Sequence, residues 1–194
     1  MAGLEDPHLG GAYPVDGNTH MPDVWSHLLE KYPILSVADI GCGFGATGRW
    51  FLDRRIKVTG IEGDSVALNS NQLPIENLIP HDYTTGPLTI PQTDLAWFAE
   101  FVEHVEERYM VNYIATFKCC KYLCMTHGEP GQDGWHHVNC QNSNWWSHRL
   151  AEYGLIMDAA ETGYLRSTDV YKAGWGRRTL MFFNNLDFNG PASA

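Results

Sequence analysis

A short apolar segment that runs directly into three closely spaced glycines is the feature that most restricts the fold of this chain. Residues 37–40 have the branched, apolar character of a buried strand, and Gly41, Gly43 and Gly45 follow at alternate positions before a helix-like segment at 46–54. Glycines in such a turn let the backbone approach a ligand closely and expose N–H groups at the start of a helix. The turn therefore predicts an α/β fold that binds a nucleotide-like ligand.

Strand-like and helix-like segments alternate along the rest of the chain. We predict strands at 34–40, 57–61, 75–80, 94–98 and 122–126, with a terminal antiparallel pair at 156–164 and 178–184. We predict helices at 22–32, 46–54, 65–73 behind Asp64 as N-cap, 102–119, and from Ser143 to Gly154. The alternation predicts a seven-stranded, mainly parallel sheet flanked by helices on both faces, with the last strand antiparallel. Ligands bind such sheets at the carboxyl ends of the strands.

The composition fits one folded domain. The chain has 194 residues, of which 44% are hydrophobic and 12% aromatic, so it can bury a core without disulfides or metals. We expect residues 1–22, rich in Gly, Pro, Asp and His, to form an irregular arm that could cover an active site, and residues 23–188 to form the domain. Five cysteines without a C-x-x-C pair indicate reduced thiols and a cytoplasmic location. No apolar run approaches the length of a membrane span, so no membrane association is predicted.

Two kinds of nucleotide fit the glycine turn. Residues 43–48 match the G-x-G-x-x-G dinucleotide fingerprint, and Glu62 follows at the distance expected of a ribose-binding acid. Asp39, at the end of the strand, favours a different ligand, because a carboxylate there repels a pyrophosphate and attracts an ammonium group. S-adenosylmethionine has no phosphate and carries an ammonium and a sulfonium group. We therefore expect S-adenosylmethionine, and an NAD(P)-dependent oxidoreductase is the alternative.

The segment from Asp39 to Gly45 resembles motif I of the class I S-adenosylmethionine-dependent methyltransferases, and residues 58–62, 79–83 and 94–105 resemble later blocks of that family in the same order. The resemblance implies a role in binding the cofactor for the following residues: Asp39, Gly41, Cys42, Gly43 and Gly45 at the methionine portion, Glu62 and Gly63 at the ribose, and His81, Asp82 and Tyr83 at the adenine. It also implies that Glu100, in the E-x-x-E-H stretch, borders the methionine end and the methyl-transfer site. The Cys42 thiol is expected to fill space and not to act as a nucleophile.

Histidines are the candidates for a catalytic base, because an oxygen acceptor usually has to lose a proton before it is methylated. His136 and His137 lie in a loop that should reach the same sheet edge as the glycine turn, and His104 ends the E-x-x-E-H stretch. We predict His137 or His136 as the base with His104 beside the site, although helix packing is an alternative role for His104. A metal site at His127, His136, His137 and Cys140 is not predicted, because the spacing matches no standard zinc pattern.

The net charge and the absence of two motifs restrict the class of molecule that could accept the methyl group. The net charge of −10 disfavours nucleic acid, and the chain has neither an Asn/Asp-Pro-Pro-Tyr motif nor a Pro-Cys dipeptide, which nucleic-acid methyltransferases use. We therefore predict a small-molecule acceptor, with O-methylation favoured over N-methylation. A catalytically inactive partner subunit that binds S-adenosylmethionine remains a further alternative.

Overall fold

The structure is a computed structural model that describes residues 8–9, 11, 14, 17–168, 174 and 176–190. The rest of the predicted arm at 1–22 lies outside the described residues, so the domain bounds at 22 and 188 stay a prediction. Among the described residues, no helix combines the length and the apolar character that crossing a bilayer requires.

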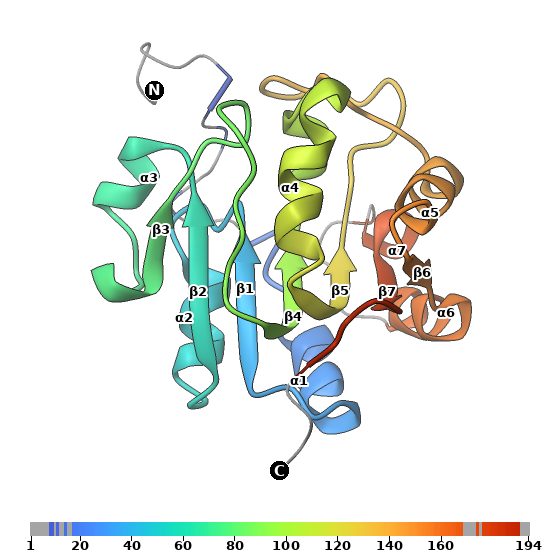
Figure 1. Ribbon diagram of the computed structural model, residues 1–194, viewed down its shortest axis with the longest axis horizontal. Helices are drawn as coiled ribbons and strands as arrows, with labels where there is room; N and C mark the ends of the chain where they lie inside the picture. The colour runs from blue at the N-terminus through green and yellow to red at the C-terminus, as the bar shows by residue number, and fades with distance from the viewer. Residues whose placement is uncertain are drawn as a thin grey trace.

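A seven-stranded sheet forms the centre of the molecule, in the order β3-β2-β1-β4-β5-β7-β6 (Figure 1). The first five strands pair in parallel, and β7 is antiparallel to both β5 and β6. The predicted mainly parallel sheet is therefore confirmed. Its strands are β1 (Ser36–Ile40), β2 (Lys57–Glu62), β3 (Leu78–Pro80), β4 (Thr93–Phe98), β5 (Cys120–Met125), β6 (Leu155–Met157) and β7 (Met181–Asn185).

Helices cover both faces of the sheet, as predicted (Figure 1). Neighbouring strand residues point to opposite faces: Val37 belongs to the apolar cluster that includes residues of α1, α2 and α6, whereas Ala38 belongs to the cluster that includes residues of α4 and α5. This alternation divides the apolar core into two layers. The α-helices are α1 (Pro22–Lys31), α2 (Ala46–Leu52), α3 (Ser65–Asn69), α4 (Met110–Phe117), α5 (Ser143–Ala151), α6 (Ala159–Ser167) and α7 (Gly176–Thr179), and the short 3₁₀ turns are η1 (Ile75–Asn77), η2 (Val102–His104) and η3 (Glu107–Tyr109).

The strand order reverses at β1, which pairs with β2 on one side and β4 on the other. The chain leaves β1 toward one edge of the sheet and later returns at β4 to build toward the other edge. Loops that follow β1 and β4 therefore separate at their carboxyl ends and leave a crevice there. The glycine turn follows β1, and the E-x-x-E-H stretch follows β4, so the topology places both predicted regions at this crevice.

The predicted helix at 102–119 is wrong in its first half. The segment forms η2 and η3 before α4 begins at Met110, because Val105 (ψ 120°) and Glu106 (ψ 141°) adopt extended backbone. The apolar spacing that suggested one helix is shared by separate turns packed on the same core. As a result, Glu103 and His104 lie on a short turn at the end of the sheet and not along a helix.

Three smaller predictions also need correction. Of the strand predicted at 75–80, only β3 is extended, because η1 occupies the first residues. The strand predicted at 156–164 ends at Met157, since Asp158 accepts a hydrogen bond from the Glu161 N–H and begins α6. Asn142, not Ser143, is the N-cap of α5. The predicted N-cap Asp64 is confirmed, although its helix is shorter than expected.

Candidate functional site

A cavity of about 490 Å³ lies at the carboxyl ends of the central strands. Its wall includes most of the predicted site residues: Gly41, Cys42, Gly43, Glu62, Gly63, His81, Asp82, Tyr83, Glu100, His104 and His137. Three predicted residues are not part of the wall: Asp39, Gly45 and His136. The topology therefore brings predicted residues together from five separate segments, while those three take other positions.

The glycine turn requires its glycines. Gly41, Gly43 and Gly45 have φ values of 64°, 52° and 79°, in the left-handed region that side chains disfavour. A Cβ at Gly41 would lie 2.7 Å from the Phe101 ring, and one at Gly45 would lie 2.0 Å from Asn71 Oδ1. The turn is thus held in one conformation by its neighbours.

The N–H groups of this turn bond within the protein. Gly41 and Cys42 donate to the Ile61 carbonyl at 2.9 and 3.1 Å, and Gly45 donates to the Cys42 carbonyl at 2.8 Å. The Gly43 N–H donates to Glu62 Oε2 at 2.8 Å. A phosphate-binding turn needs such N–H groups free to face the ligand. Here they stabilise the turn itself.

Glu62 joins the turn to the end of β2. Besides the Gly43 N–H, its carboxylate accepts the N–H groups of Gly63 and Asp64, each at 2.8 Å on Oε1. Burial raises the pKa of Glu62, and these three bonds oppose the rise because they favour the charged form. A carboxylate accepts about four hydrogen bonds. Glu62 therefore retains acceptor capacity on the cavity side.

Asp39 faces away from the cavity. Its side chain is buried, and Oδ2 accepts the Gly48 N–H of α2 at 2.8 Å. Burial raises its pKa to about 7, although the Gly48 bond opposes the rise. In the structure Asp39 fixes the start of α2 against β1 and holds the glycine turn from behind. Asp39 is therefore not positioned for the direct contact with a ligand that the sequence suggested.

We expect Asp39→Asn to change how stability depends on pH. Because the folded-state pKa is about 7 and the ordinary value is 3.8, the stability that this group contributes is complete below about pH 4 and is lost as pH rises to about 7. Asn keeps the acceptor for the Gly48 N–H but cannot ionise. The free energy of unfolding of the variant, relative to that of wild type, should therefore rise by a few kcal/mol between pH 4 and pH 8. Urea unfolding at both pH values measures this gain. Parallel pH profiles would show that the pKa of Asp39 is the same in the folded and unfolded states.

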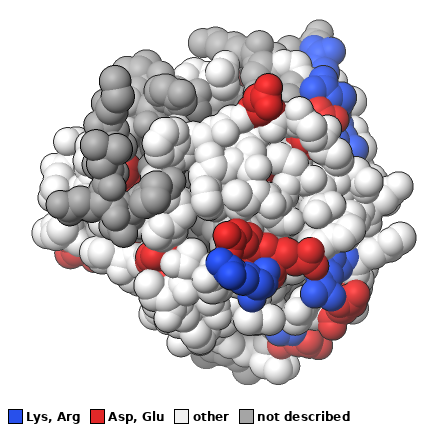
Figure 2. Space-filling view, turned by 90° about the horizontal axis from the view of Figure 1, so that it is seen from above, with Lys and Arg blue, Asp and Glu red and all other residues white. Residues whose placement is uncertain are grey.

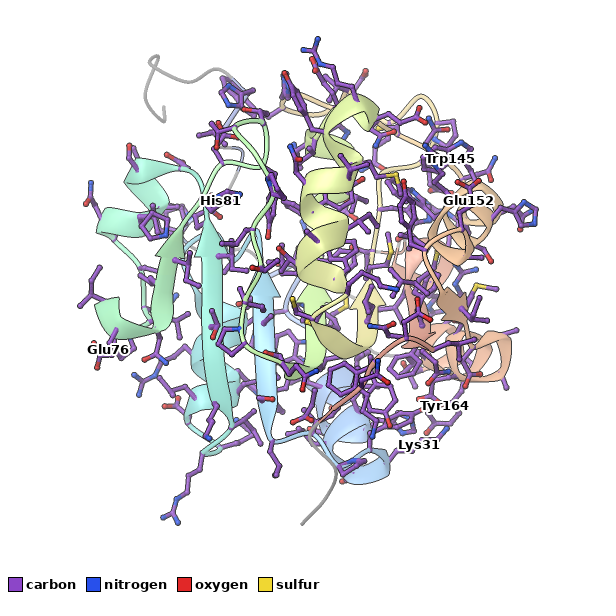
Figure 3. The ribbon with its side chains drawn as sticks, viewed as in Figure 1. Lys31, Glu76, His81, Trp145, Glu152 and Tyr164 are labelled. Carbon is purple, nitrogen blue, oxygen red and sulfur yellow. The ribbon has the colours of Figure 1, made fainter. Side chains whose placement is uncertain are left out.

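The corner predicted to hold adenine is formed by His81, Asp82 and Tyr83. His81 follows β3 at the upper end of the sheet (Figure 3), where its ring stands edge-on to the Tyr83 ring. Asp82 accepts hydrogen bonds from His8 and from Thr84. Burial alone would raise the pKa of Asp82, but the bonds from His8 and Thr84 outweigh it and lower the pKa. The arm thus reaches this corner of the cavity through His8.

The opposite wall is formed by the E-x-x-E-H stretch and the loop after β5. Glu100 accepts the Thr126 hydroxyl at 2.9 Å and the Gln132 amide at 3.3 Å. Burial lowers the pKa of His104 to about 4, and the neighbouring His137 adds to this shift, so the neutral imidazole is favoured. Glu103 lies behind His104, and burial followed by the charge of Glu100 raises its pKa well above the ordinary range.

Known structures share this architecture, whereas no family model and no curated protein sequence matches the chain. The methyltransferase domain of bacterial CtHen1 aligns with a TM-score of 0.60 at 16% identity, over 84% of this chain and 96% of that one. The plantazolicin methyltransferase BpumL, solved with SAH, aligns with a TM-score of 0.57 at 13% identity, over 84% and 80%. LepI, solved with SAM, aligns with a TM-score of 0.57 at 13% identity, over 89% of this chain and 50% of LepI. The chain has the class I methyltransferase fold.

Several residues of this methyltransferase fold that shape the cavity were not predicted from the sequence. The Asn71 amide donates to the Gly43 carbonyl at 2.7 Å, and Asn71 Oδ1 accepts the Leu73 N–H at 3.0 Å. Asn71 follows α3 in a segment without periodicity, so no pattern in the sequence marks it. Gln132 and Glu103 were also missed, although Glu103 stands in the E-x-x-E-H stretch and only its neighbours were chosen.

Proposed function

We propose that this protein is an S-adenosylmethionine-dependent methyltransferase. The observation that carries the proposal is the pairing of Glu62 with the glycine turn at the wall of the cavity. Glu62 occupies the Gly43 N–H with its own negative charge, which would repel a pyrophosphate at that position. Its remaining acceptor site suits a ribose hydroxyl. A nucleoside without phosphates fits this wall better than a dinucleotide does.

The cofactor would extend along the crevice from β3 to β4. Its adenine would lie at His81, Asp82 and Tyr83, its ribose at Glu62 and Gly63, and its methionine portion along Gly41, Cys42 and Gly43, with Glu100 beyond. This arrangement follows the strand order β3-β2-β1-β4, because each of these groups of residues lies at or after the end of one of these strands. In this proposal Asp39 and Gly45 act by holding the turn and not by touching the cofactor.

The acceptor we propose is a small molecule methylated on oxygen. A cavity of about 490 Å³ must hold the cofactor as well, which leaves room for a compact acceptor. Figure 2 looks onto this end of the sheet, and the Lys and Arg residues described there form small separate groups, most of them beside Asp or Glu. No broad basic surface is present among the described residues of this face, in agreement with the net charge of −10.

The chemistry is an in-line displacement. The acceptor hydroxyl loses its proton, its oxygen forms a bond to the methyl carbon, and the carbon–sulfur bond breaks with its electron pair left on sulfur. The sulfonium becomes a neutral thioether, S-adenosylhomocysteine. The protein contributes mainly by aligning the acceptor with the methyl group. Of the three histidines predicted near this step, His104 and His137 reach the cavity and His136 does not.

We expect S-adenosylhomocysteine to stabilise the protein and NADH or NADPH to leave it unchanged. A ligand at 100 times its dissociation constant adds about 2.7 kcal/mol to the free energy of unfolding. Thermal melting with each nucleotide measures the shift, and a panel of hydroxylated acceptors with methyl-labelled S-adenosylmethionine measures transfer. Stabilisation by a nicotinamide nucleotide alone would refute the proposal. Binding of S-adenosylhomocysteine without transfer to any acceptor would favour the inactive partner subunit.

A further inference from the structure

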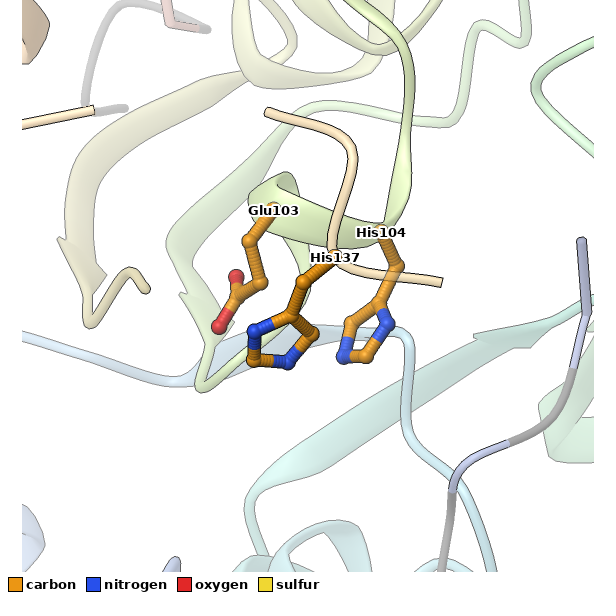
Figure 4. A group of neighbouring side chains, drawn as sticks. All are labelled: Glu103, His104 and His137. Carbon is orange, nitrogen blue, oxygen red and sulfur yellow. The ribbon is translucent and has the colours of Figure 1, made fainter. Parts of the chain in front are cut away.

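Three side chains that can bind a metal ion converge at the cavity wall formed by the stretch after β4 and the loop after β5. Glu103 and His104 come from η2, and His137 comes from the loop between β5 and α5 (Figure 4). One nitrogen or oxygen atom of each side chain lies within 4.8 Å of those of the other two. His104 and His137 line the cavity, and Glu103 is buried beside them.

Both histidines present the same free ring nitrogen. His104 Nδ1 lies 2.7 Å from the Trp135 carbonyl, and His137 Nδ1 lies 3.1 Å from the Gln132 carbonyl. A carbonyl only accepts, so each Nδ1 carries the hydrogen and donates it. Each Nε2 is then left with a free lone pair. Histidines that bind metals usually have this support, which fixes the orientation of the ring.

Glu103 provides an independent observation. Its side chain is 0% exposed, and neither carboxylate oxygen has a hydrogen-bond partner among the described residues. Removing a carboxylate from water without a partner is costly. A bound cation would compensate this cost directly.

The backbone holds the three side chains together. The N–H groups of Val138 and Asn139 both donate to the Glu103 carbonyl, at 2.9 and 3.0 Å. These two bonds fix the position of His137 relative to η2, although His137 lies far from Glu103 in the sequence. The Trp135 carbonyl that orients His104 belongs to the same loop. The cluster is therefore supported from both of its segments.

We propose that Glu103, His104 and His137 bind a divalent transition-metal ion at the wall of the cavity. Two imidazoles and one carboxylate are a ligand set typical of Mn²⁺, Fe²⁺, Co²⁺ or Zn²⁺ sites, and three protein ligands leave positions open for another molecule. The imidazole edges line the cavity, so the open positions face the space that the acceptor would occupy.

The role of the ion in catalysis rests on the proposed methyltransferase function. An acceptor hydroxyl bound at an open position has a lowered pKa and releases its proton to solvent. The oxygen then forms the bond to the methyl carbon while the carbon–sulfur bond breaks toward sulfur. His104 and His137 are then metal ligands and not general bases. Transfer should therefore cease after treatment with EDTA and return with added Mn²⁺ or Co²⁺.

The site is tested by metal binding to the full chain, first stripped with EDTA and dialysed. Loss of the free Mn²⁺ electron paramagnetic resonance signal should show one ion per chain, and Co²⁺ should give an absorption spectrum typical of imidazole coordination. His104→Ala, His137→Ala and Glu103→Gln should each lower the affinity roughly tenfold or more. His136→Ala is the matched control, because His136 adjoins His137 but lies outside the cavity wall. It should bind like wild type.

Two results would overturn the site: no Mn²⁺ or Co²⁺ bound by the wild-type chain at millimolar metal, or unchanged affinity in folded His104→Ala and His137→Ala. If these variants do not fold, wild type still decides the question, because bound Mn²⁺ must broaden the nuclear magnetic resonance signals of His104 and His137 before that of His20. S-adenosylhomocysteine affinity is measured on the same samples. Nucleoside binding without metal binding refutes only the metal site, and the reverse refutes only the proposed function.

Discussion

Replacing Glu62 with Ala should weaken S-adenosylhomocysteine binding roughly 10- to 100-fold. A hydrogen bond to a charged group contributes about 1.5 to 3 kcal/mol, and a ribose hydroxyl would lose its acceptor. At about 1.4 kcal/mol for each factor of ten, this one bond accounts for the loss. The substitution also leaves the N–H groups of Gly43, Gly63 and Asp64 without their acceptor, which loosens the turn that borders the ligand. Isothermal titration calorimetry measures the affinity.

Two further variants separate charge from shape. Glu62→Gln keeps one oxygen for the Gly63 and Asp64 N–H groups but turns an NH₂ group toward the Gly43 N–H, so its affinity should lie between those of wild type and Glu62→Ala. Glu76→Ala removes an equal charge at an exposed position far from His81 (Figure 3) and should bind as wild type does. Wild-type affinity in a folded Glu62→Ala variant would remove Glu62 from the proposed ribose site.

The sequence predicts the half of the site that rests on local patterns. Strands are recognised from short apolar runs, and parallel strands bring their carboxyl ends to one edge, so the glycine turn, Glu62 and Asp82 could be expected there. The orientation of Asp39 also follows from a rule that applies to every strand. Residues two apart share a face, and Val37 faces α2, so Asp39 faces the Gly48 N–H of α2. The preference of a carboxylate for an ammonium group suggested a ligand contact for Asp39, whereas the strand geometry directs its side chain to α2.

The other half of the site depends on contacts between loops, which no periodicity encodes. Asn71 reaches the Gly43 carbonyl only because the segment after α3 folds back on the turn. His137 meets η2 because two backbone N–H groups bind the Glu103 carbonyl, and backbone bonds of this kind leave no mark in the residue types. For the same reason the sequence offered His136 and His137 as equal candidates, whereas only His137 reaches the cavity.

Replacing Trp25 with Ala should cost about 3 to 5 kcal/mol of stability, the usual range for removing a large buried aromatic side chain. Trp25 is fully buried on α1, and its ring centroid lies 5.1 Å from that of Trp50, 5.5 Å from Trp97 and 5.8 Å from Phe51. It is the contact at which α1, α2 and β4 meet on one face of the sheet. Urea unfolding, compared with wild type and with Leu35→Ala at an exposed position, measures the loss.

Trp25→Phe distinguishes packing from polarity at the same position. The indole Nε1–H is buried and has no partner among the described residues, and an unsatisfied donor of this kind costs about 1 to 3 kcal/mol. Phe removes that donor and keeps most of the ring contact, so its loss of stability should be much smaller than that of Ala. Equal losses in the two variants would contradict this account. Because α1 begins directly after the arm that brings His8 to Asp82, weakened packing at Trp25 should also reduce the order of that corner of the cavity.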